Sequence, residues 1–305
     1  MRWLDAMPDP PLAIEIGADR LAGVRWARNG SVHDISIEPL PPGAVVPSAV
    51  ETNLANVDAL RMAISNVCRR LHAKDEDVAM LLPDPVIRVF VQHFEQFPRS
   101  PQEALPMLRW KLKKSVPFGA DETVLSYMRQ APREGGVDVL TAFARLRIVR
   151  EYEELAESAG LRAGVILSSS LAAAALLEEH TTTLLARVSD AILTTAIVRD
   201  GLMCGYRCTE LPARGNDLTP QMLLAEIFPA TVYYKDIWHD NIKLIRVAGL
   251  GARLPEFVGP LQSEFHCSVK SLLHSAVSEG RIPEDARPLA DSELEGLAGW
   301  MMNRG

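Results

Sequence analysis

A strand–turn–strand pattern near the start of the chain could bind a phosphate. Residues 12–26 read LAIEIGADRLAGVRW, in which two apolar runs flank Glu-Ile-Gly-Ala-Asp. Backbone N–H groups of the turn at Gly17 could hold an anion, with Glu15 as an acidic partner of a metal ion. The same residues could equally form an ordinary hairpin. Other residues of the chain are needed to distinguish these two interpretations.

The other residues of chemically reactive type lack useful spacing. Cys204 and Cys208 lie on an expected strand, roughly 13 Å apart, which is too far for a disulfide or a shared metal. The pairs His239–Asp240 and His266–Cys267 have no further ligand at zinc-site spacing. Ser168–Ser170 precedes an Ala-rich segment, which favours helix capping over nucleophilic catalysis. We therefore expect no catalytic residue and no metal site.

Composition narrows the class of protein. The chain has 305 residues, of which 48% are apolar, which suits two lobes or one large α/β unit. Its net charge of −7 argues against nucleic acid as a partner, because such binding depends on Lys and Arg. The leader MRWLDAMPDPP has no apolar core of signal-peptide length, and no apolar run reaches about 18 residues. With four scattered cysteines, we expect a cytoplasmic protein with reduced thiols.

The first segment is predicted to have the order β-β-β-α-β. Turn residues at Gly17 and the Asn29-Gly30 pair separate the first three strands. Apolar residues recur at intervals of three and four after them and indicate a helix. The expected strands are Leu12–Ile16, Leu21–Trp26, Ser31–Ile37 and Asp77–Pro83, and the expected helix is Val57–Leu71.

The last segment repeats this order. The expected strands are Thr183–Val188, Ala191–Val198, Gly201–Cys208 and Ile242–Val247, with a helix at Thr219–Trp238. We expect Pro229 to kink or end this helix. The two halves share little residue identity, so the repeat is one of architecture. Two such lobes predict an α/β fold of the actin-like, duplicated ribonuclease-H-like kind, with any ligand in the cleft between the lobes.

Extra material lies between the halves and has an α+β pattern. Its expected strands are Val86–Phe94, Thr123–Arg129 and Val137–Arg145, and its helices are Glu103–Ser115 and Val149–Ala159. We predict three units: a first lobe from 1–85 plus 164–180, an inserted subdomain from 86–163, and a shortened second lobe from 181–305. The insertion helix carries a basic cluster that could be a solvated face, or could contact an acidic partner or anionic lipid headgroups.

Several motifs in the right order resemble the PilM family of type IV pilus proteins and the related FtsA family. The most specific match is LRWKLKKSVPFGADETVLSY, Leu108–Tyr127. Other segments that resemble the family are LAIEIGADRLAGV, Pro42–Val46, Arg145–Leu161, Val247–Phe257 and Ala290–Arg304. Together they span most of the chain.

The resemblance implies two actin-like lobes with an inserted subdomain, and a role in assembly. Family members bind ATP between the lobes, and they bind the short cytoplasmic tail of the membrane protein PilN in a groove bordered by the insertion. Carried over to this chain, the expected partner-binding residues are Arg109, Trp110, Lys113, Val116, Pro117 and Phe118.

The first of the three nucleotide loops implied by the resemblance is only partly kept. In the family this loop has an acidic residue followed by x-Gly-Ser/Thr. Here Glu15 and Gly17 fit this pattern, Ala18 replaces the hydroxyl residue, and Asp19 follows.

The second and third loops depart further. The family pattern Asp-x-Gly is replaced by Arg187-Val188-Ser189, which removes a carboxylate from the Mg²⁺ side, although an Arg could contact phosphate directly. The family pattern Gly-Gly-Gly-x-Lys/Arg is replaced by Gly249-Leu250-Gly251-Ala252-Arg253, with a bulky Leu where close approach needs glycine. Between Leu211 and Ile242 the chain also lacks the residues that wall the adenine pocket in the family.

We therefore expect a scaffold with a weak or lost ATP site: no cofactor, with ATP and Mg²⁺ as the less favoured alternative. Its expected partner is the tail of a PilN-like membrane protein, at the inner face of the inner membrane, and self-association stays open. The alternative is an active ATPase or a nucleotide-switched protein of the same fold. A sugar or acid kinase is disfavoured, because no carboxylate base follows the second hairpin beside a matching phosphate loop.

Overall fold

The computed structural model describes residues 8–26, 31–116, 118–119, 122–133 and 135–302. Its first sheet has five strands in the order β3-β2-β1-β4-β8. β1 pairs with β2 in antiparallel and with β4 in parallel fashion. The strands are β1 (Leu12–Ile16), β2 (Arg20–Trp26), β3 (Val32–Pro39), β4 (Asp77–Leu82) and β8 (Arg162–Ser168).

The second sheet repeats the first, with the order β11-β10-β9-β12-β13. Its strands are β9 (Thr183–Ser189), β10 (Ile192–Arg199), β11 (Leu202–Glu210), β12 (Leu244–Ala248) and β13 (Ser268–Ser271). The predicted β-β-β-α-β order of both halves is confirmed, and so is the actin-like α/β fold. The turn predicted at Asn29-Gly30 lies outside the described residues.

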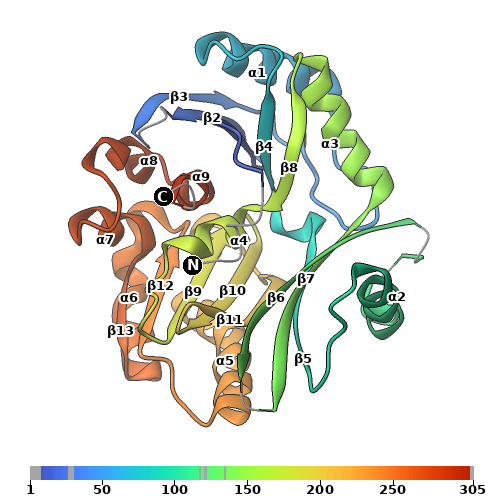
Figure 1. Ribbon diagram of the computed structural model, residues 1–305. Coiled ribbons are helices and arrows are strands. Elements are labelled where there is room, and N and C mark those ends of the chain that lie inside the picture. The colour runs from blue at the N-terminus through green and yellow to red at the C-terminus, as the bar shows by residue number, and fades with distance from the viewer. Residues whose placement is uncertain (1–7, 27–30, 117, 120–121, 134, 303–305) are drawn as a thin grey trace.

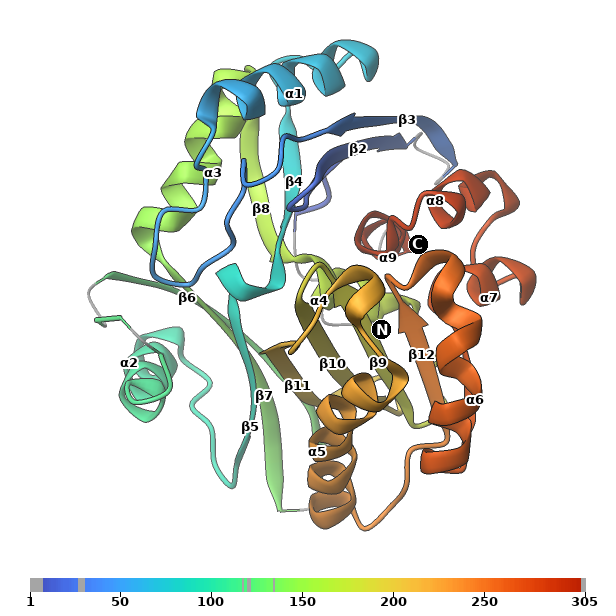
Figure 2. The same ribbon diagram turned by 180° about the vertical axis from the view of Figure 1, so that it is seen from behind.

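Helices cover both sheets (Figure 1). α1 and α3 lie on one face of the first sheet, and α9 lies on its other face. Figure 2 shows α5 and α6 beside the second sheet. The helices are α1 (Val57–Arg70), α2 (Pro101–Leu112), α3 (Leu146–Ser158), α4 (Ser169–Ala173), α5 (Pro220–Trp238), α6 (Leu254–Phe265), α7 (Leu272–Ser278), α8 (Arg287–Asp291) and α9 (Glu295–Met302). Short 3₁₀ turns are η1 (Asp84–Val86), η3 (Ala174–Leu176), η4 (Gly215–Asp217), η5 (Gly251–Arg253) and η6 (Glu284–Ala286).

A third, three-stranded sheet comes from the insertion. Its order is β5-β7-β6, with β5 (Arg88–Phe94), β6 (Thr123–Arg133) and β7 (Gly136–Arg145). α2 packs Ala104 and Leu108 against Val137 and Val139 of β7 in a small core of their own. Strand residues alternate between two faces, so Leu140 and Ala144 of β7 point the other way and join the main core. The inserted sheet is thus packed between α2 and the body of the protein.

The C-terminal helix completes the core of the first sheet. Leu297 and Trp300 of α9 are fully buried in the same cluster as Ala13 of β1 and Val24 of β2, which share the face of Glu15. Gly299 lets α9 approach α4 so closely that a Cβ would lie 2.1 Å from the carbonyl oxygen of Ala172. The division of the chain at residue 181 stays a prediction. Within the described residues, no helix is both long and apolar enough to cross a membrane.

Three details differ from the expectations. α5 runs through Pro229 to Trp238, so the prediction that this proline could end the helix is wrong. Pro229 lies on the exposed face of α5, where water can satisfy the carbonyl group that loses its N–H partner. The Ala-rich helix, expected at Leu171–Glu179, instead begins at Ser169 and ends at Ala173, with Ser168 as its cap. β8 adds a fifth strand that the sequence pattern did not predict.

Candidate functional site

The first two predicted loops are joined by a buried ion pair. Glu15 lies on β1 of the first sheet and Arg187 on β9 of the second, and Nη2 of Arg187 donates to Oε1 of Glu15 at 2.8 Å. Both residues are 7% exposed. Ile14 faces the α1 side of its sheet, so alternation turns Glu15 toward α9 and the second sheet. Leu184 and Ala186 face α5 and α6, so Arg187 points the opposite way, toward Glu15.

Two more carboxylates surround the same guanidinium. Oδ2 of Asp84 lies 3.7 Å from Nη1 of Arg187, and Oε2 of Glu295 lies 3.5 Å from Nε. Asp84 comes directly after β4 and Pro83, and Glu295 is the first residue of α9. We call Arg187, Glu15, Asp84 and Glu295 the arginine cluster. It ties both five-stranded sheets to the C-terminal helix.

The environment of the arginine cluster shifts two pKa values. Burial raises the pKa of the Glu15 carboxyl, with Arg187 opposing that rise. Burial acts to lower the pKa of Arg187, but Glu15, Glu295 and Asp84 outweigh it and raise this pKa. Arg187 therefore keeps its positive charge. Three acidic groups around one cation leave no charge on Arg187 free for a further anion.

Asp84 is the hydrogen-bonding centre of the cluster. Its carboxylate accepts from Ser168 Oγ at 2.5 Å and from the Ser170 N–H at 2.9 Å. From the second sheet it accepts from Thr194 Oγ1 at 2.7 Å and from the Tyr206 hydroxyl at 3.4 Å. Hydrogen bonds from both sheets therefore converge on one carboxylate, which fixes how the sheets face each other.

The turns beyond this ion pair share a cavity of about 460 Å³. Ala18 and Asp19 of the first loop and Ser189 and Asp190 of the second line it, opposite Gly43–Pro47. Arg214 lies at its edge, 3.5 Å from Asp190. The structure thus brings the first and second predicted loops to one place. Gly17 lies in the turn itself, where its N–H donates to the Arg20 carbonyl.

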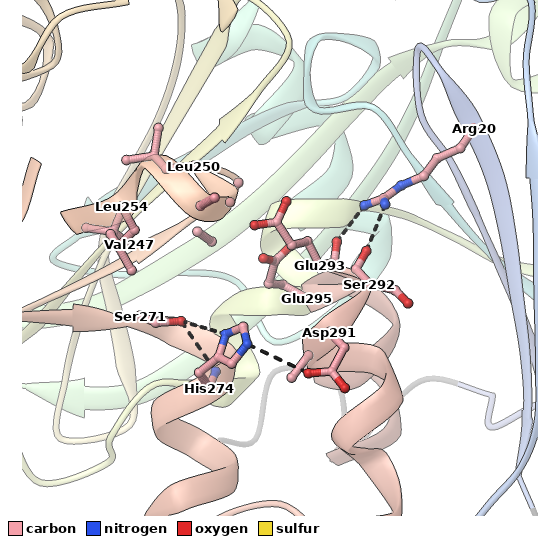
Figure 3. Close-up of a pocket in the computed structure, with 15 residues that line it drawn as sticks. Arg20, Val247, Leu250, Leu254, Ser271, His274, Asp291, Ser292, Glu293 and Glu295 are labelled. Carbon is pink, nitrogen blue, oxygen red and sulfur yellow. Dashed lines mark hydrogen bonds and ion pairs between the residues drawn. The ribbon is translucent and has the colours of Figure 1, made fainter. Parts of the chain in front are cut away.

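The third predicted loop lines a second cavity, of about 490 Å³ (Figure 3). Figure 3 shows Glu293 and Glu295 on one side of it and Leu250 on the other. Arg20 belongs to the same wall, but its guanidinium donates to the carbonyls of Ser292 and Glu293, each at 2.7 Å. This cation is therefore engaged by backbone, and the acidic side chains dominate the cavity.

The glycines and the arginine of the third loop have structural roles here. Gly249 has φ +75°, and a Cβ on it would lie 1.8 Å from the carbonyl oxygen of Val188. Gly251 also has positive φ, at +52°. Arg253 donates to the carbonyls of Gly215 and Leu218 and pairs with Glu256 at 2.7 Å. Its guanidinium thus holds the segment before α5 rather than facing a cavity.

These residues do not fit the phosphates of a magnesium nucleotide. A magnesium site needs oxygen ligands, and here a guanidinium bound to Glu15 stands where the fold family has a carboxylate. Phosphates need unpaired N–H donors or cations, whereas Arg187, Arg20 and Arg253 are all engaged within the chain. Within the described residues, no group of three or more His, Cys, Asp and Glu could hold a metal ion.

Sequence reasoning missed half of the arginine cluster. Asp84 carried one usable signal, because it follows a predicted strand at the end where α/β sheets bind ligands. Glu295 carried no such signal, since it opens an otherwise apolar segment, EGLAGWMM. That acidic residue is 4% exposed, which only the packing of α9 reveals.

The predicted partner-binding residues lie elsewhere, on and after α2, and they divide into two groups. Arg109, Trp110 and Lys113 are exposed. Val116 and Phe118 are half-buried, and Pro117 lies outside the described residues.

Comparison with known proteins gives a family and a fold. The family model described as type IV pilus assembly protein PilM matches residues 21–201. No curated protein matches the chain. Among solved structures, the PilM-PilN type IV pilus biogenesis complex is similar with a TM-score of 0.76 and 17% identity, covering 98% of this chain and 100% of that one.

Two further solved structures are more distant. An inorganic polyphosphate/ATP-glucomannokinase from Arthrobacter sp. strain KM is similar at a TM-score of 0.51 and 12% identity, covering 97% of this chain and 98% of that one. A Bacteroides thetaiotaomicron VPI-5482 protein with an actin-like ATPase fold and unknown function is similar at 0.50 and 10%, covering 88% and 93%. At these identities the likenesses show the fold alone.

Proposed function

The chain belongs to the type IV pilus assembly protein PilM family, and from that premise we propose that it is a scaffold of an inner-membrane assembly platform. It serves a type IV pilus or a related secretion machine, at the cytoplasmic face of the inner membrane. There it binds the N-terminal cytoplasmic tail of a PilN-like membrane protein. The likeness in fold to a PilM-PilN complex supports this partner.

One observation favours a scaffold over an ATPase: the ion pair between Glu15 and Arg187. In this pair a cation of the chain itself neutralises the acidic residue of the first loop. The two lobes are therefore joined without a bound nucleotide. We propose that the ATP site is lost and that the protein is a pseudo-ATPase. The alternative, a nucleotide-switched protein, is supported only by the two cavities beside the loops.

For the tail we propose a site where the inserted subdomain borders the first lobe. Arg145 of the insertion joins the two by donating to the Val50 carbonyl of the first lobe at 2.7 Å, and it also pairs with Glu122 within the insertion. Val116 and Phe118, which follow α2, offer the half-buried apolar surface that a linear peptide needs.

Calorimetric titration of the full chain with the tail peptide tests this function. The peptide is the N-terminal tail of the membrane protein encoded beside this gene, and a scrambled peptide is the control. We expect saturable binding that Phe118→Ala weakens by about tenfold or more. The matched change Phe228→Ala, at a 50% exposed position on α5, should leave it unchanged. Absence of binding by the unaltered chain would overturn the scaffold function.

A second titration, with ATP and Mg²⁺, tests the lost site separately. A ligand at 100 times its Kd adds about 2.7 kcal/mol to the free energy of unfolding. We expect no heat of binding at millimolar ATP and no rise in melting temperature. Micromolar binding would favour the nucleotide-switched alternative whatever the tail peptide does.

A further inference from the structure

We propose that the outward face of α2 is a docking surface for an anionic lipid membrane. This outer face consists of Arg109 and Trp110 of α2 and of Lys113 and Lys114 in the turn that follows it. It is a different surface from Val116 and Phe118, the apolar residues after α2 that we propose for the tail, and the proposal does not depend on the tail. The occupant is a bilayer surface rich in acidic headgroups.

The packing of α2 turns Trp110 away from the protein. Ala104, Leu108 and Leu112 are buried, on the side that faces the inserted sheet. Each helical residue advances by about 100°, so Trp110 stands about 200° from Leu108, on the opposite side. Trp110 is 81% exposed, the highest value among the exposed large apolar side chains of the described residues.

That exposure is exceptional among the tryptophans that the structure describes. Trp26 and Trp300 are 3% and 0% exposed. Trp238 is half-buried and stacks on Tyr234. An indole has an apolar body and one polar N–H, which suits the boundary between water and lipid. Tryptophan is enriched at protein interfaces and in membrane-interface belts for this reason.

The charge around Trp110 opposes that of the whole protein. The chain has a net charge of −7, yet residues 86–145 carry nine Lys and Arg against six Asp and Glu. Three of the seven lysines of the chain lie at positions 111, 113 and 114. A positive patch on an acidic protein points to a negatively charged partner.

Among the described residues, the cations of the outer face have no partner that would keep them from contacting acidic headgroups. No hydrogen bond or ion pair to another described residue is found for Arg109, Lys113 or Lys114. Lys111, in contrast, turns inward, where its Nζ lies 3.8 Å from the ring centre of Phe94 and donates to the His93 carbonyl. Glu103, two turns before Trp110, is the acidic side chain of α2 and is also exposed.

The shape of this face favours a membrane over an acidic peptide. Peptides and small ligands bind in clefts that bury them, whereas Trp110 projects from the outer side of a helix. Lysines beside an exposed tryptophan allow the ring to enter the interface while the ammonium groups contact headgroups. Such contacts are reversible and weaken as salt increases.

Vesicle co-sedimentation of the full chain tests this proposal. We expect binding to vesicles rich in phosphatidylglycerol at low salt, loss of binding at high salt, and none to pure phosphatidylcholine vesicles. The double change Lys113→Glu with Lys114→Glu should lower the partition coefficient by about tenfold or more. Trp110→Tyr should abolish any blue shift of the tryptophan emission on vesicle binding.

A matched control uses another helix. The double change Arg61→Glu with Met62→Ala replaces a cation and the apolar residue next to it on α1, where Met62 is 69% exposed. These changes should leave vesicle binding intact, and circular dichroism should show that all variants remain folded. The proposal is wrong if the unaltered chain does not bind phosphatidylglycerol vesicles. It is also wrong if the α1 control variant and the variant with Lys113→Glu and Lys114→Glu lose vesicle binding equally. Loss of tail-peptide binding with unchanged vesicle binding would assign the outer face to a protein partner instead.

Discussion

The two five-stranded sheets have the same strand order and opposite charges at one equivalent position. Glu15 stands two residues before Gly17 in β1, and Arg187 stands two residues before Ser189 in β9. Two acidic residues facing each other across the lobes would repel and would need a bound cation. Here the second lobe supplies that cation as a side chain. Side chains of the chain itself therefore form this contact between the two sheets.

The sheets also differ in the chain segments that come after their fourth strands. β12 leads through η5 directly into α6. β4 leads instead into the inserted sheet and α2 before α3 begins. The first half thus carries the surfaces that we propose for the tail and the membrane, while the second half contributes Arg187 and α9 to holding the first half in place.

Arg187→Ala should lower the free energy of unfolding more than the other changes proposed below, because it removes the cation that the second sheet supplies. The change leaves Glu15, Asp84 and Glu295 buried without their cation, and breaking a buried pair in this way costs about 3–5 kcal/mol. Urea denaturation measures the loss in the free energy of unfolding.

Two control variants show whether the loss of stability in Arg187→Ala comes from the lost charge. Arg162→Ala removes an exposed pair with Asp77 in the first sheet and should cost at most about 1 kcal/mol. Arg187→Met keeps much of the side-chain volume but not the charge, so it should be as destabilising as Arg187→Ala. If Arg187→Met were nearly neutral, packing rather than charge would join the lobes.

Gly299→Ala should have a smaller effect, and it tests whether the second half completes the first core. The added methyl group would lie 2.1 Å from the Ala172 carbonyl oxygen, so α9 must move away from α4. Overpacking of this kind costs about 1–3 kcal/mol. Thermal unfolding should show the loss.

The matched change is Gly259→Ala in α6. Nothing lies within 4 Å of its added Cβ, and alanine favours helix by up to about 1 kcal/mol. A slight gain is therefore expected there. Equal losses at both glycines would mean that the α9–α4 contact is not tight.

The sequence could predict the duplicated fold because its signals are local. Glycine turns and alternating apolar residues lie within each strand pair, and both halves repeat them. β8 escaped prediction because its exposed and buried residues follow no clear alternation. The contacts of the arginine cluster could not be predicted for a different reason. Glu15 and Arg187 are 172 residues apart in the sequence, and no local pattern indicates that they are in contact. Departures from the family pattern marked Arg187 as unusual, but only the packing of two sheets shows its partners.

Glu15→Gln should have the smallest effect and a distinctive pH dependence. Because burial raises the pKa of Glu15 in the folded protein, its contribution to stability is complete below the unfolded pKa of 4.5 and is lost as the pH rises through the folded pKa. Glutamine does not titrate, so the wild type should lose stability relative to Glu15→Gln as the pH rises above 4.5. Each unit of pKa shift changes that difference by about 1.4 kcal/mol. The opposite trend would mean that attraction to Arg187 outweighs the effect of burial on Glu15. The ion pair between the two sheets would then be strong even though three acidic groups share one arginine.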